Sequence, residues 1–446
     1  MKIRNNVAAV QGEMIKSLQE FLRIPSVIDE TCEQRPFGLE IDRALKHVLS
    51  LCESLGFRTY YDPEGYYGYA EVGAGEDMIG ILGHVDVVPE GDASNWKHAP
   101  FGGEIASGRI YGRGAIDDKG PVIAAVYAIK ALLDAGVVFN KRVRLILGTD
   151  EENGWRCICR YVKTEEHPTM GFTPDSNFPV IYAEKGLLQF RLKSDKKSEL
   201  RVHGGTAMNA VPESAVYTGD HLYRLEKQLK KLGFDHELEG EELFVIGKSA
   251  HSAKPSAGVN AIVRMAAALK DIGIETPIIT FIAEKIGFTT NGELIFGSLH
   301  DEPSGELTLS VNQMDLSAFG EMIGIDARIP VTFDKKFVVD GLKRVADKYG
   351  LTYEEIDYLA PLYISKDTPL IQTLVSVYEE ETGLSGDPIP TGGATYARSM
   401  PNIVAYGPNF PGQEKVAHFT DEYIDINAMI KCAQIYAKAL EKLLEA

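Results

Sequence analysis

Residues 78–86 read Met-Ile-Gly-Ile-Leu-Gly-His-Val-Asp, an apolar run that ends in a histidine and an aspartate. A short apolar run of this kind is typical of a buried strand. Val143–Leu147 is a second such run, and it leads into Thr149-Asp150-Glu151-Glu152. Between the two, Pro121–Leu133 has the pattern of a helix, with a proline suited to its first turn and Gly136 suited to its end. Strand, helix and strand in this order predict an α/β unit with a mostly parallel sheet flanked by helices.

Outside this unit, apolar residues at helical spacing predict helices, and shorter apolar runs predict strands. Helices are expected at 8–22, Val259–Lys270 and Ile426–Leu444, and strands at 186–193 and 243–247. Two clusters of charged residues, Lys193–Arg201 and Glu237–Glu242, are interpreted as solvated loops.

The overall composition is that of an ordinary globular protein. The chain has 446 residues and a formal net charge of -18. An acidic surface repels phosphate backbones, so a nucleic-acid partner is not expected. No stretch approaches the roughly 20 apolar residues that a membrane span needs, so no membrane partner is expected either.

The cysteines and the N-terminal residues both bear on location. The chain has five cysteines, an odd and small number for its length, which predicts no disulfide framework. Residues 1–25 show neither a continuous apolar core nor a small-residue cleavage site. A reducing, cytoplasmic location is therefore expected.

The first candidate metal ligand follows the first strand. His84 and Asp86 point the same way along an extended chain, so His84 could bind a metal through one ring nitrogen while Asp86 holds the other. Taken alone, a histidine and an aspartate at this spacing are more often structural.

A second candidate lies in the glycine-rich stretch Tyr111–Gly120, where Asp117 and Asp118 come just before the expected helix. The simplest structural role is a helix cap, yet two adjacent aspartates are more than one cap needs. Glu151 and Glu152 follow the second strand, and burying both is costly unless a cation neutralises them. An exposed acidic loop explains that pair equally well.

Asp175 and His418 are two further candidates that are unremarkable alone. Taken together, however, the order and spacing of all these segments resemble the co-catalytic dinuclear-zinc metallopeptidase family. That family includes carnosinase, acetylornithine deacetylase and succinyl-diaminopimelate desuccinylase, and the PepV-type dipeptidases are its most similar branch. The resemblance covers nearly the whole chain and is most specific at Gly83–Asp86, Trp96–Phe101, Tyr111–Pro121, Asp150–Glu152, Ala250–Ser252 and Gly392–Arg398. Ala394 stands where PepV-type members more often have a third glycine.

The resemblance implies a set of five metal ligands. Asp117 would bridge two metal ions. His84 and Asp175 would complete the binding of one ion, and Glu152 and His418 would complete the binding of the other. Two divalent ions per chain are therefore expected, with zinc as the first choice for these ligands and manganese or cobalt compatible.

The resemblance also implies catalytic roles near the metal ions. Glu151 would be the general base, and Asp86 would orient His84. A cis peptide bond is expected between Asp117 and Asp118. His251, farther along the chain, would stabilise the tetrahedral oxyanion.

The remaining implied features concern an inserted domain. A catalytic domain would comprise residues 1–183 and 385–446, and an α+β lid domain would comprise residues 184–384. Asn209 and Arg328 match substrate-binding positions, as do Gly392 and Gly393. Arg328 is expected to bind the free carboxylate of the substrate through two hydrogen bonds.

These assignments predict a dipeptidase that hydrolyses unblocked dipeptides with a metal-activated water molecule and Glu151 as the base. No oligomeric partner is implied, and the chain is expected to be a monomer. An amidohydrolase that removes acyl groups from amino acids would have the same metal core, so it remains the alternative.

Two other classes of protein are less well supported. A metal-binding or interaction protein without activity should have lost a ligand or the base, and the full set is present. Cys157 and Cys159 could suggest thiol chemistry, but both are interpreted as structural.

Overall fold

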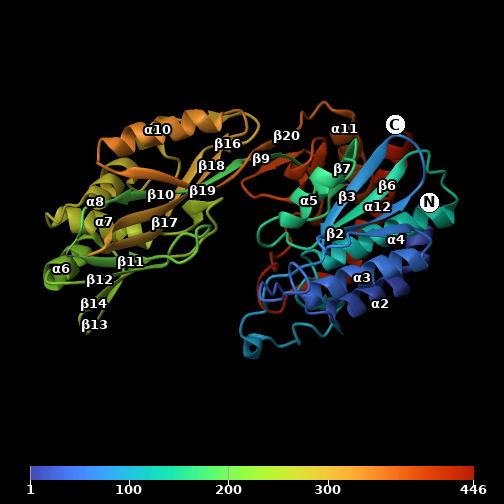
Figure 1. Ribbon diagram of the computed structural model, residues 1–446, viewed down its shortest axis with the longest axis horizontal. Helices are drawn as coiled ribbons and strands as arrows, with labels where there is room; N and C mark the ends of the chain where they lie inside the picture. Colours follow the sequence, from blue (N-terminus) through green and yellow to red (C-terminus); the bar gives the residue numbers. More distant parts are fainter. Residues whose placement is uncertain (1, 199, 446) are drawn as a thin grey trace. The chain divides into compact units, whose positions relative to one another are not determined.

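The computed structural model describes residues 2–198 and 200–445, which fold into two compact units (Figure 1). The first unit contains Met1–Tyr182, Ile364–Ile389 and Thr395–Ala446, and the second contains Ala183–Tyr363 and Pro390–Ala394. Residues 1 and 446, at the ends of the expected catalytic domain, and residue 199, in the loop expected at Lys193–Arg201, lie outside the described residues.

The first unit alternates helices and strands. Its helices are α1 (Lys2–Ala9), α2 (Gln11–Leu22), α3 (Leu39–Ser54), α4 (Lys119–Ala135), α5 (Arg156–Thr164), α11 (Pro369–Thr382) and α12 (Ile426–Glu445), with short 3₁₀ helices η1 (Ala93–Asn95) and η4 (Tyr396–Ser399). Its strands are β1 (Arg58–Tyr61), β2 (Tyr67–Val72), β3 (Met78–His84), β4 (Glu104–Ala106), β5 (Arg109–Tyr111), β6 (Arg142–Gly148), β7 (Met170–Thr173), β8 (Ser176–Asn177), β22 (Ile403–Ala405), β23 (Pro408–Asn409) and β24 (Tyr423–Asp425). Strands β9 (Ile181–Glu184) and β21 (Ile389–Thr391) each begin in this unit and end in the second.

The main sheet of this unit has a parallel centre and antiparallel edges. Its strands run in the order β1-β2-β6-β3-β7-β22-β9. Strand β3 is parallel to β6 and to β7, and β7 is parallel to β22. Strands β1, β2 and β9 pair antiparallel with their neighbours. The sequence therefore predicted correctly the α/β class and the parallel pairing of the strands on either side of Pro121–Leu133.

Glycines let two helices pack closely on one face of the sheet. A Cβ on Gly83 in β3 would lie 2.5 Å from Val122 in α4, and a Cβ on Gly68 in β2 would lie 2.7 Å from Leu49 in α3. Gly68 and Gly83 both pair with Leu147 of β6, so the two glycines face the same side. Helix α4 is buried over most of its length and begins at the residue after Asp118. Its close packing on β3 therefore fixes the Asp117–Asp118 segment next to the end of that strand.

The second unit is built on an antiparallel sheet of eight strands in the order β13-β14-β12-β11-β17-β18-β10-β19. These strands are β10 (Gly186–Ser194), β11 (Arg201–Gly204), β12 (Ser214–Thr218), β13 (His236–Glu239), β14 (Glu242–Ile246), β17 (Thr308–Ser317), β18 (Gly320–Ile329) and β19 (Thr352–Leu359). The shorter strands are β15 (His300–Asp301), β16 (Gly305–Glu306) and β20 (Leu362–Tyr363). The helices are α6 (Leu222–Leu232), η2 (Pro255–Ala257), α7 (Ala261–Asp271), α8 (Pro277–Phe281), the π-helix η3 (Ile282–Ile286), α9 (Glu293–Phe296) and α10 (Lys335–Asp347).

Strand β10 shows why one face of this sheet is covered. Leu188, Phe190 and Leu192 alternate with polar residues and are fully buried in the core of the unit. Glu237–Glu242, interpreted above as a loop, instead forms the edge hairpin of β13 and β14. That interpretation was wrong because an edge strand with exposed side chains can carry charges without losing its pairing.

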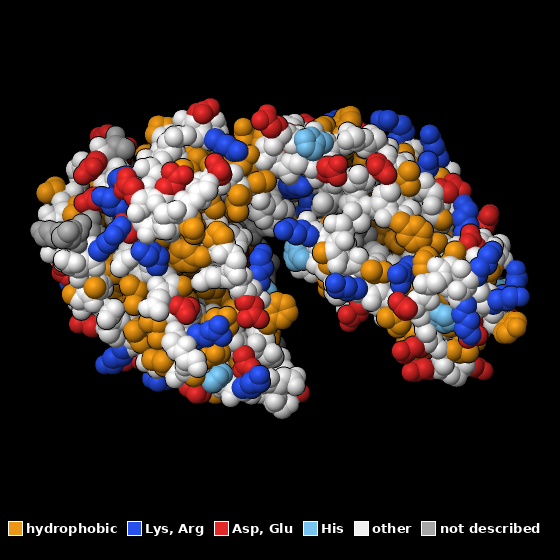
Figure 2. All heavy atoms as spheres, turned by 180° about the vertical axis from the view of Figure 1, so that it is seen from behind, with side chains coloured by type: hydrophobic (Ala, Val, Ile, Leu, Met, Phe, Trp, Pro, Cys, Tyr) orange, Lys and Arg blue, Asp and Glu red, His pale blue; other side chains and the backbone are white. Residues whose placement is uncertain are grey.

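The surface and the longer helices carry two further observations. Basic and acidic side chains both occur across the face that Figure 2 shows. Among the described residues, no helix has the length and apolar character needed to cross a membrane. All five cysteines are free thiols.

Candidate metal centre

Four predicted site residues lie at or just beyond the carboxyl ends of parallel strands. His84 is the last residue of β3, the pair Glu151–Glu152 follows β6, and Asp175 follows β7. Since β3 is parallel to β6 and β7, the carboxyl ends of the three strands meet at one edge of the sheet. Asp117 comes just before α4, and His418 lies in the loop between β23 and β24. All six residues therefore belong to the first unit.

The carboxylate of Asp117 lies between two imidazole rings. Its Oδ1 is 3.0 Å from Nε2 of His84, and its Oδ2 is 3.1 Å from Nε2 of His418. Each oxygen of this one carboxylate faces a different histidine nitrogen. This is the arrangement by which a carboxylate can contact two cations at the same time.

Further carboxylates surround the same two imidazoles. Oδ2 of Asp175 is 3.7 Å from Nε2 of His84, and Oε1 of Glu152 is 3.1 Å from Nε2 of His418. Two groups of three residues bring their potential ligand atoms within 4.8 Å of one another. The first group is His84, Asp117 and Glu152. The second group is His84, Glu151 and Asp175. Imidazole nitrogens and carboxylate oxygens without a thiolate are donors that suit zinc, manganese or cobalt. The residues therefore fit divalent cations.

Asp86 fixes the orientation of both the histidine and the glutamates. Its carboxylate accepts hydrogen bonds from the backbone N–H groups of Glu151 and Glu152, each at 3.1 Å. Its backbone oxygen is 2.9 Å from Nδ1 of His84, while its carboxylate Oδ1 is 3.5 Å from that nitrogen. The carbonyl of Asp86 thus directs Nε2 of His84 toward Asp117, and its side chain acts mainly on the loop after β6.

The carboxyl groups of this cluster strongly affect one another's protonation. Burial and the charge of Asp117 raise the pKa of Asp175 to about 8. Burial also raises the pKa of Glu151 well above its usual range, and the neighbouring carboxylates of Asp175 and Glu152 add to the shift. Hydrogen bonds to Asp117 and Glu152 raise the pKa of His418 to about 11. Crowded carboxylates of this kind are stabilised by a nearby cation.

Asp118 lies at the end of the same segment but serves neither as a cap nor as a bridge. The peptide bond between Asp117 and Asp118 is cis, as expected. Asp118 is completely buried and makes no side-chain cap bond to α4. Its Oδ2 accepts a hydrogen bond from the backbone N–H of His84 at 3.3 Å. Burial and the charge of Asp175 raise the pKa of Asp118 well above its usual range, so its neutral form is favoured.

The other predicted site residues belong to the second unit, where they form two pairs. The backbone N–H of Ser252 donates to the carbonyl of Asn209 at 2.9 Å, so Asn209 lies beside His251. Arg328 donates through Nη1 to the carbonyl of Gly392 at 2.9 Å. Gly393 follows in the same short segment of this unit.

Two residues that the sequence did not single out contact the ligand-bearing loops. Arg113 and Glu422 form a buried ion pair at 2.7 Å, and Glu422 also accepts a hydrogen bond from the backbone N–H of Asp117. Their only sequence signal is that each lies within five residues of a predicted ligand. Cys157 is buried and Cys159 is exposed, although both lie on α5.

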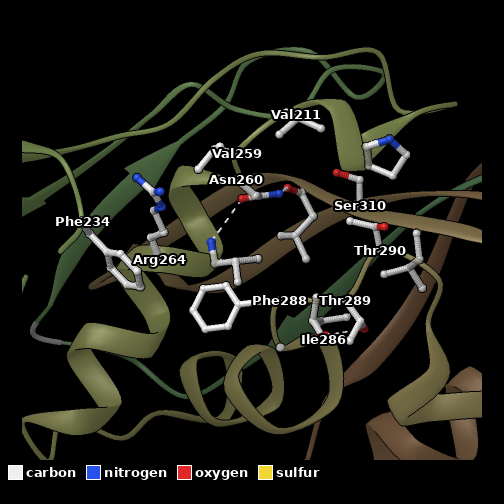
Figure 3. A pocket seen from close by; sticks show the side chains of 16 residues that line it. Val211, Phe234, Val259, Asn260, Arg264, Ile286, Phe288, Thr289, Thr290 and Ser310 are labelled. Carbon is white, nitrogen blue, oxygen red and sulfur yellow. Dashed lines mark hydrogen bonds between the residues drawn. The ribbon is translucent and has the colours of Figure 1, made fainter. Parts of the chain in front are cut away.

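A cavity of about 230 Å³ in the second unit offers fewer groups for chemistry (Figure 3). Its walls are largely apolar, and its polar groups take part in internal bonds. Asn260 accepts a hydrogen bond from the backbone N–H of Val263 and so caps α7, while Arg264 donates to the carbonyl of Ile246. The cluster in the first unit is therefore the stronger candidate for a reactive centre.

Comparison with known proteins agrees with this choice. The model of peptidase family M20/M25/M40 matches residues 80–442. Over 455 aligned residues, the chain is 39% identical to "Putative dipeptidase YtjP" of Bacillus subtilis (strain 168), and the alignment covers 97% of each chain. The identity to "Putative dipeptidase SSP1012" of Staphylococcus saprophyticus is 34%, with 99% of each chain covered.

The fold also matches solved structures. Human carnosine dipeptidase 1 superposes with a TM-score of 0.63 at 15% identity, covering 100% of this chain and 98% of that one. An α/β unit with a parallel centre combined with an antiparallel sheet unit is thus the fold of that enzyme as well. Since the family model spans most of the sequence and two relatives exceed 30% identity over almost its full length, the chain belongs to peptidase family M20/M25/M40 and is a metallopeptidase.

Proposed function

We propose that this chain is a metal-dependent dipeptidase that hydrolyses unblocked dipeptides. The observation that carries the proposal is the carboxylate of Asp117 between the imidazoles of His84 and His418. The names of the relatives that match over nearly the whole chain point to the substrate class. A cytoplasmic location is part of the same proposal and rests on the five free cysteines.

Five side chains would hold two divalent cations, with zinc as the first choice. Asp117 would contact both ions, His84 and Asp175 would contact one, and Glu152 and His418 would contact the other. When bound, such ions polarise a peptide carbonyl and lower the pKa of a water molecule.

Glu151 would act as the general base. Its carboxyl is crowded by Asp175 and Glu152, which favours its taking up a proton, and its backbone is held by Asp86. A base with a raised pKa can accept a proton from the attacking water and then deliver it to the leaving amine. Asp86 would keep Glu151 and His84 in their working orientations.

The second unit would supply the contacts to the substrate. Asn209 and His251 lie side by side there, and Arg328 lies beside Gly392. His251 would stabilise the oxyanion, and Arg328, Asn209, Gly392 and Gly393 would bind the rest of the dipeptide. In this proposal the second unit, which takes the place of the insert expected at residues 184–384, works as the lid domain of a monomer.

The test compares substrates and metal ions in one assay. Protein treated with a chelator should be inactive and should regain activity with zinc, manganese or cobalt. The reconstituted enzyme should release amino acids from unblocked dipeptides much faster than from N-acyl amino acids. Faster cleavage of N-acyl amino acids would contradict the dipeptidase proposal and favour an amidohydrolase, and full activity in metal-free protein would contradict the metal requirement.

A further inference from the structure

The turn that carries His418 is held from outside by polar contacts. His418 and Asp421 both have positive φ angles, 68° and 55°, in a region that residues other than glycine rarely adopt. A turn with two such residues is not the locally preferred conformation of its sequence. Contacts with the surrounding residues must therefore stabilise the conformation of this turn.

The segment that leads into this turn is anchored at both ends, because Phe410 packs on Phe178 with ring centroids 4.7 Å apart and Val416 is buried. Between these ends, part of the segment lines a cavity of about 280 Å³. The side chains that line the cavity from this segment and from β24 are largely polar, and they include Asn409, Gln413, Glu414 and Asp425. Between Val416 and Glu422, polar contacts hold the backbone of the turn that carries His418.

Arg113 makes the first set of these contacts. Its guanidinium donates to the carbonyl of Phe419 at 3.2 Å and lies 3.4 Å from the carbonyl of His418. It also donates to the carbonyl of Pro89 at 3.3 Å and forms an ion pair with Glu422 at 2.7 Å. Only 2% of Arg113 is exposed, so these bonds are little weakened by water.

Glu422 joins the same turn to the segment of Asp117. Its Oε1 accepts hydrogen bonds from the backbone N–H groups of Ile116 at 3.0 Å and Asp117 at 3.3 Å. Its carbonyl accepts a hydrogen bond from the N–H of Gly112 at 2.9 Å. Glu422 is completely buried, so its second oxygen depends on Arg113 for a partner. One ion pair thus holds the backbone on both sides of the Asp117–His418 contact.

We propose that Arg113 and Glu422 are positioning residues that set the distance between Asp117 and His418. The proposal rests on the proposed function, because it gives these two residues a role at the metal centre described there. Their effect should be uneven. The cation position formed by Asp117, Glu152 and His418 depends on the turn, whereas His84 and Asp175 are fixed by the ends of β3 and β7.

The test is a titration of the metal-free full-length chain with Co²⁺ and with Zn²⁺, followed by calorimetry and by the visible spectrum of bound Co²⁺. We expect wild-type protein to bind two ions per chain. Glu422→Gln leaves the buried charge of Arg113 without its partner. It should therefore lower the affinity for one of the two ions by about 10- to 100-fold and leave the affinity for the other ion unchanged. Arg113→Lys keeps the charge but cannot make all the bonds of the fork, so its effect should be smaller and in the same direction.

Glu71→Gln is the matched control. Glu71 forms a comparably buried ion pair with Arg144 in the same unit, at 2.8 Å, and the further ion pairs of these two residues go to Arg58 and Glu165. This variant should unfold at a lower temperature and still bind two ions with wild-type affinity. Arg113→Lys provides the measurement if Glu422→Gln does not fold.

Three results would overturn the positioning role. The first is wild-type affinity for both ions in Glu422→Gln and Arg113→Lys. The second is an equal loss of affinity for both ions in these variants. The third is a loss of affinity in Glu71→Gln as large as that in Glu422→Gln. If wild-type protein itself bound no divalent cation, the proposed function would fail together with the positioning role. The two failures are therefore distinguishable.

Discussion

Arg328 donates two hydrogen bonds to the carboxylate of Asp326, from Nε to Oδ1 at 2.6 Å and from Nη2 to Oδ2 at 2.9 Å. Both side chains are buried, and Gln189 donates to the same carboxylate at 3.0 Å. The guanidinium group of Arg328 was expected to bind the carboxylate of a substrate. In the structure it is bound to the carboxylate of Asp326. Asp326 fixes the plane of the guanidinium and neutralises much of its charge, so a substrate would meet the outer N–H groups.

A first prediction concerns recognition of the carboxylate of a dipeptide. Arg328→Lys should raise KM for free dipeptides by about 10-fold, since an ammonium cannot replace the planar fork. The preference of the wild-type enzyme for free over C-terminally amidated dipeptides should narrow in this variant. Steady-state kinetics with both forms of one dipeptide provide the measurement. Equal cleavage of free and amidated substrates by the wild-type enzyme would contradict this role for Arg328.

A second prediction separates the base from the ligands. Glu151→Gln should lower kcat by about 10²- to 10⁴-fold, because an amide cannot accept the proton from water. The metal content by elemental analysis should stay at the wild-type value. Glu152→Gln is the matched variant, and it should lose part of the bound metal. Loss of metal in Glu151→Gln would instead make Glu151 a ligand, which the distances permit because its carboxyl lies in one of the two potential ligand sets.

A third prediction concerns the stability of chelated protein at different pH values. Asp175 has a pKa of about 8 in the fold against an ordinary value of 3.8, and His418 has a pKa of about 11 against 6.5. Between pH 3.8 and about 8 for Asp175, and between pH 6.5 and about 11 for His418, the folded state binds more protons than the unfolded chain. The free energy of unfolding should therefore fall as pH rises. The lowered pKa of Asp117 acts in the opposite direction, but only below its ordinary value of 3.8.

Melting curves of chelated and zinc-loaded protein from about pH 5 to about pH 8 test this linkage. The melting temperature of chelated protein should fall across the range. Zinc competes with protons for the same ligands, so the gap between the two forms should widen with pH. Asp175→Asn should flatten the curve of the chelated protein. A gap that stays constant with pH would count against a cation among these carboxylates.

A fourth prediction tests the sheet that positions the ligands. A Cβ on Gly171 in β7 would lie 2.0 Å from the backbone oxygen of Gly80 in β3, where no side chain can move aside. Gly171→Ala should therefore destabilise the protein by about 3 kcal/mol or more and reduce metal binding. Gly12→Ala in α2 is the control, because nothing lies within 4 Å of its added Cβ. It should keep full metal binding and stay within about 1 kcal/mol of wild type in chemical denaturation. Similar stability of the two variants would show that β3 and β7 do not pack as closely as described.

The sequence by itself determined the local elements and marked several of the candidate ligands. Apolar runs that are buried on both faces gave β3 and β6, and Gly136 ended α4 in a left-handed conformation as expected. Because parallel strands end at one edge of a sheet, the residues after them lie close together, and short-range patterns therefore marked His84 and Glu151–Glu152 as candidates. The resemblance to the family added His418, which no local pattern marks.

Only the tertiary structure decided which groups face each other across long sequence separations. The sequence paired Asp86 with His84, and the structure places Asp86 against Nδ1 of that histidine, but only the folded chain shows that the Asp86 carboxylate also binds the N–H groups of Glu151 and Glu152. Residues 364–389, part of which the sequence placed in the insert, group with the first unit, since α11 packs on α12. The sequence did not indicate which residues would pair with Arg328 and Glu422. The physical reason is that periodicity and turn chemistry act over a few residues, whereas a buried charge takes the partner that the folded chain brings within hydrogen-bonding distance.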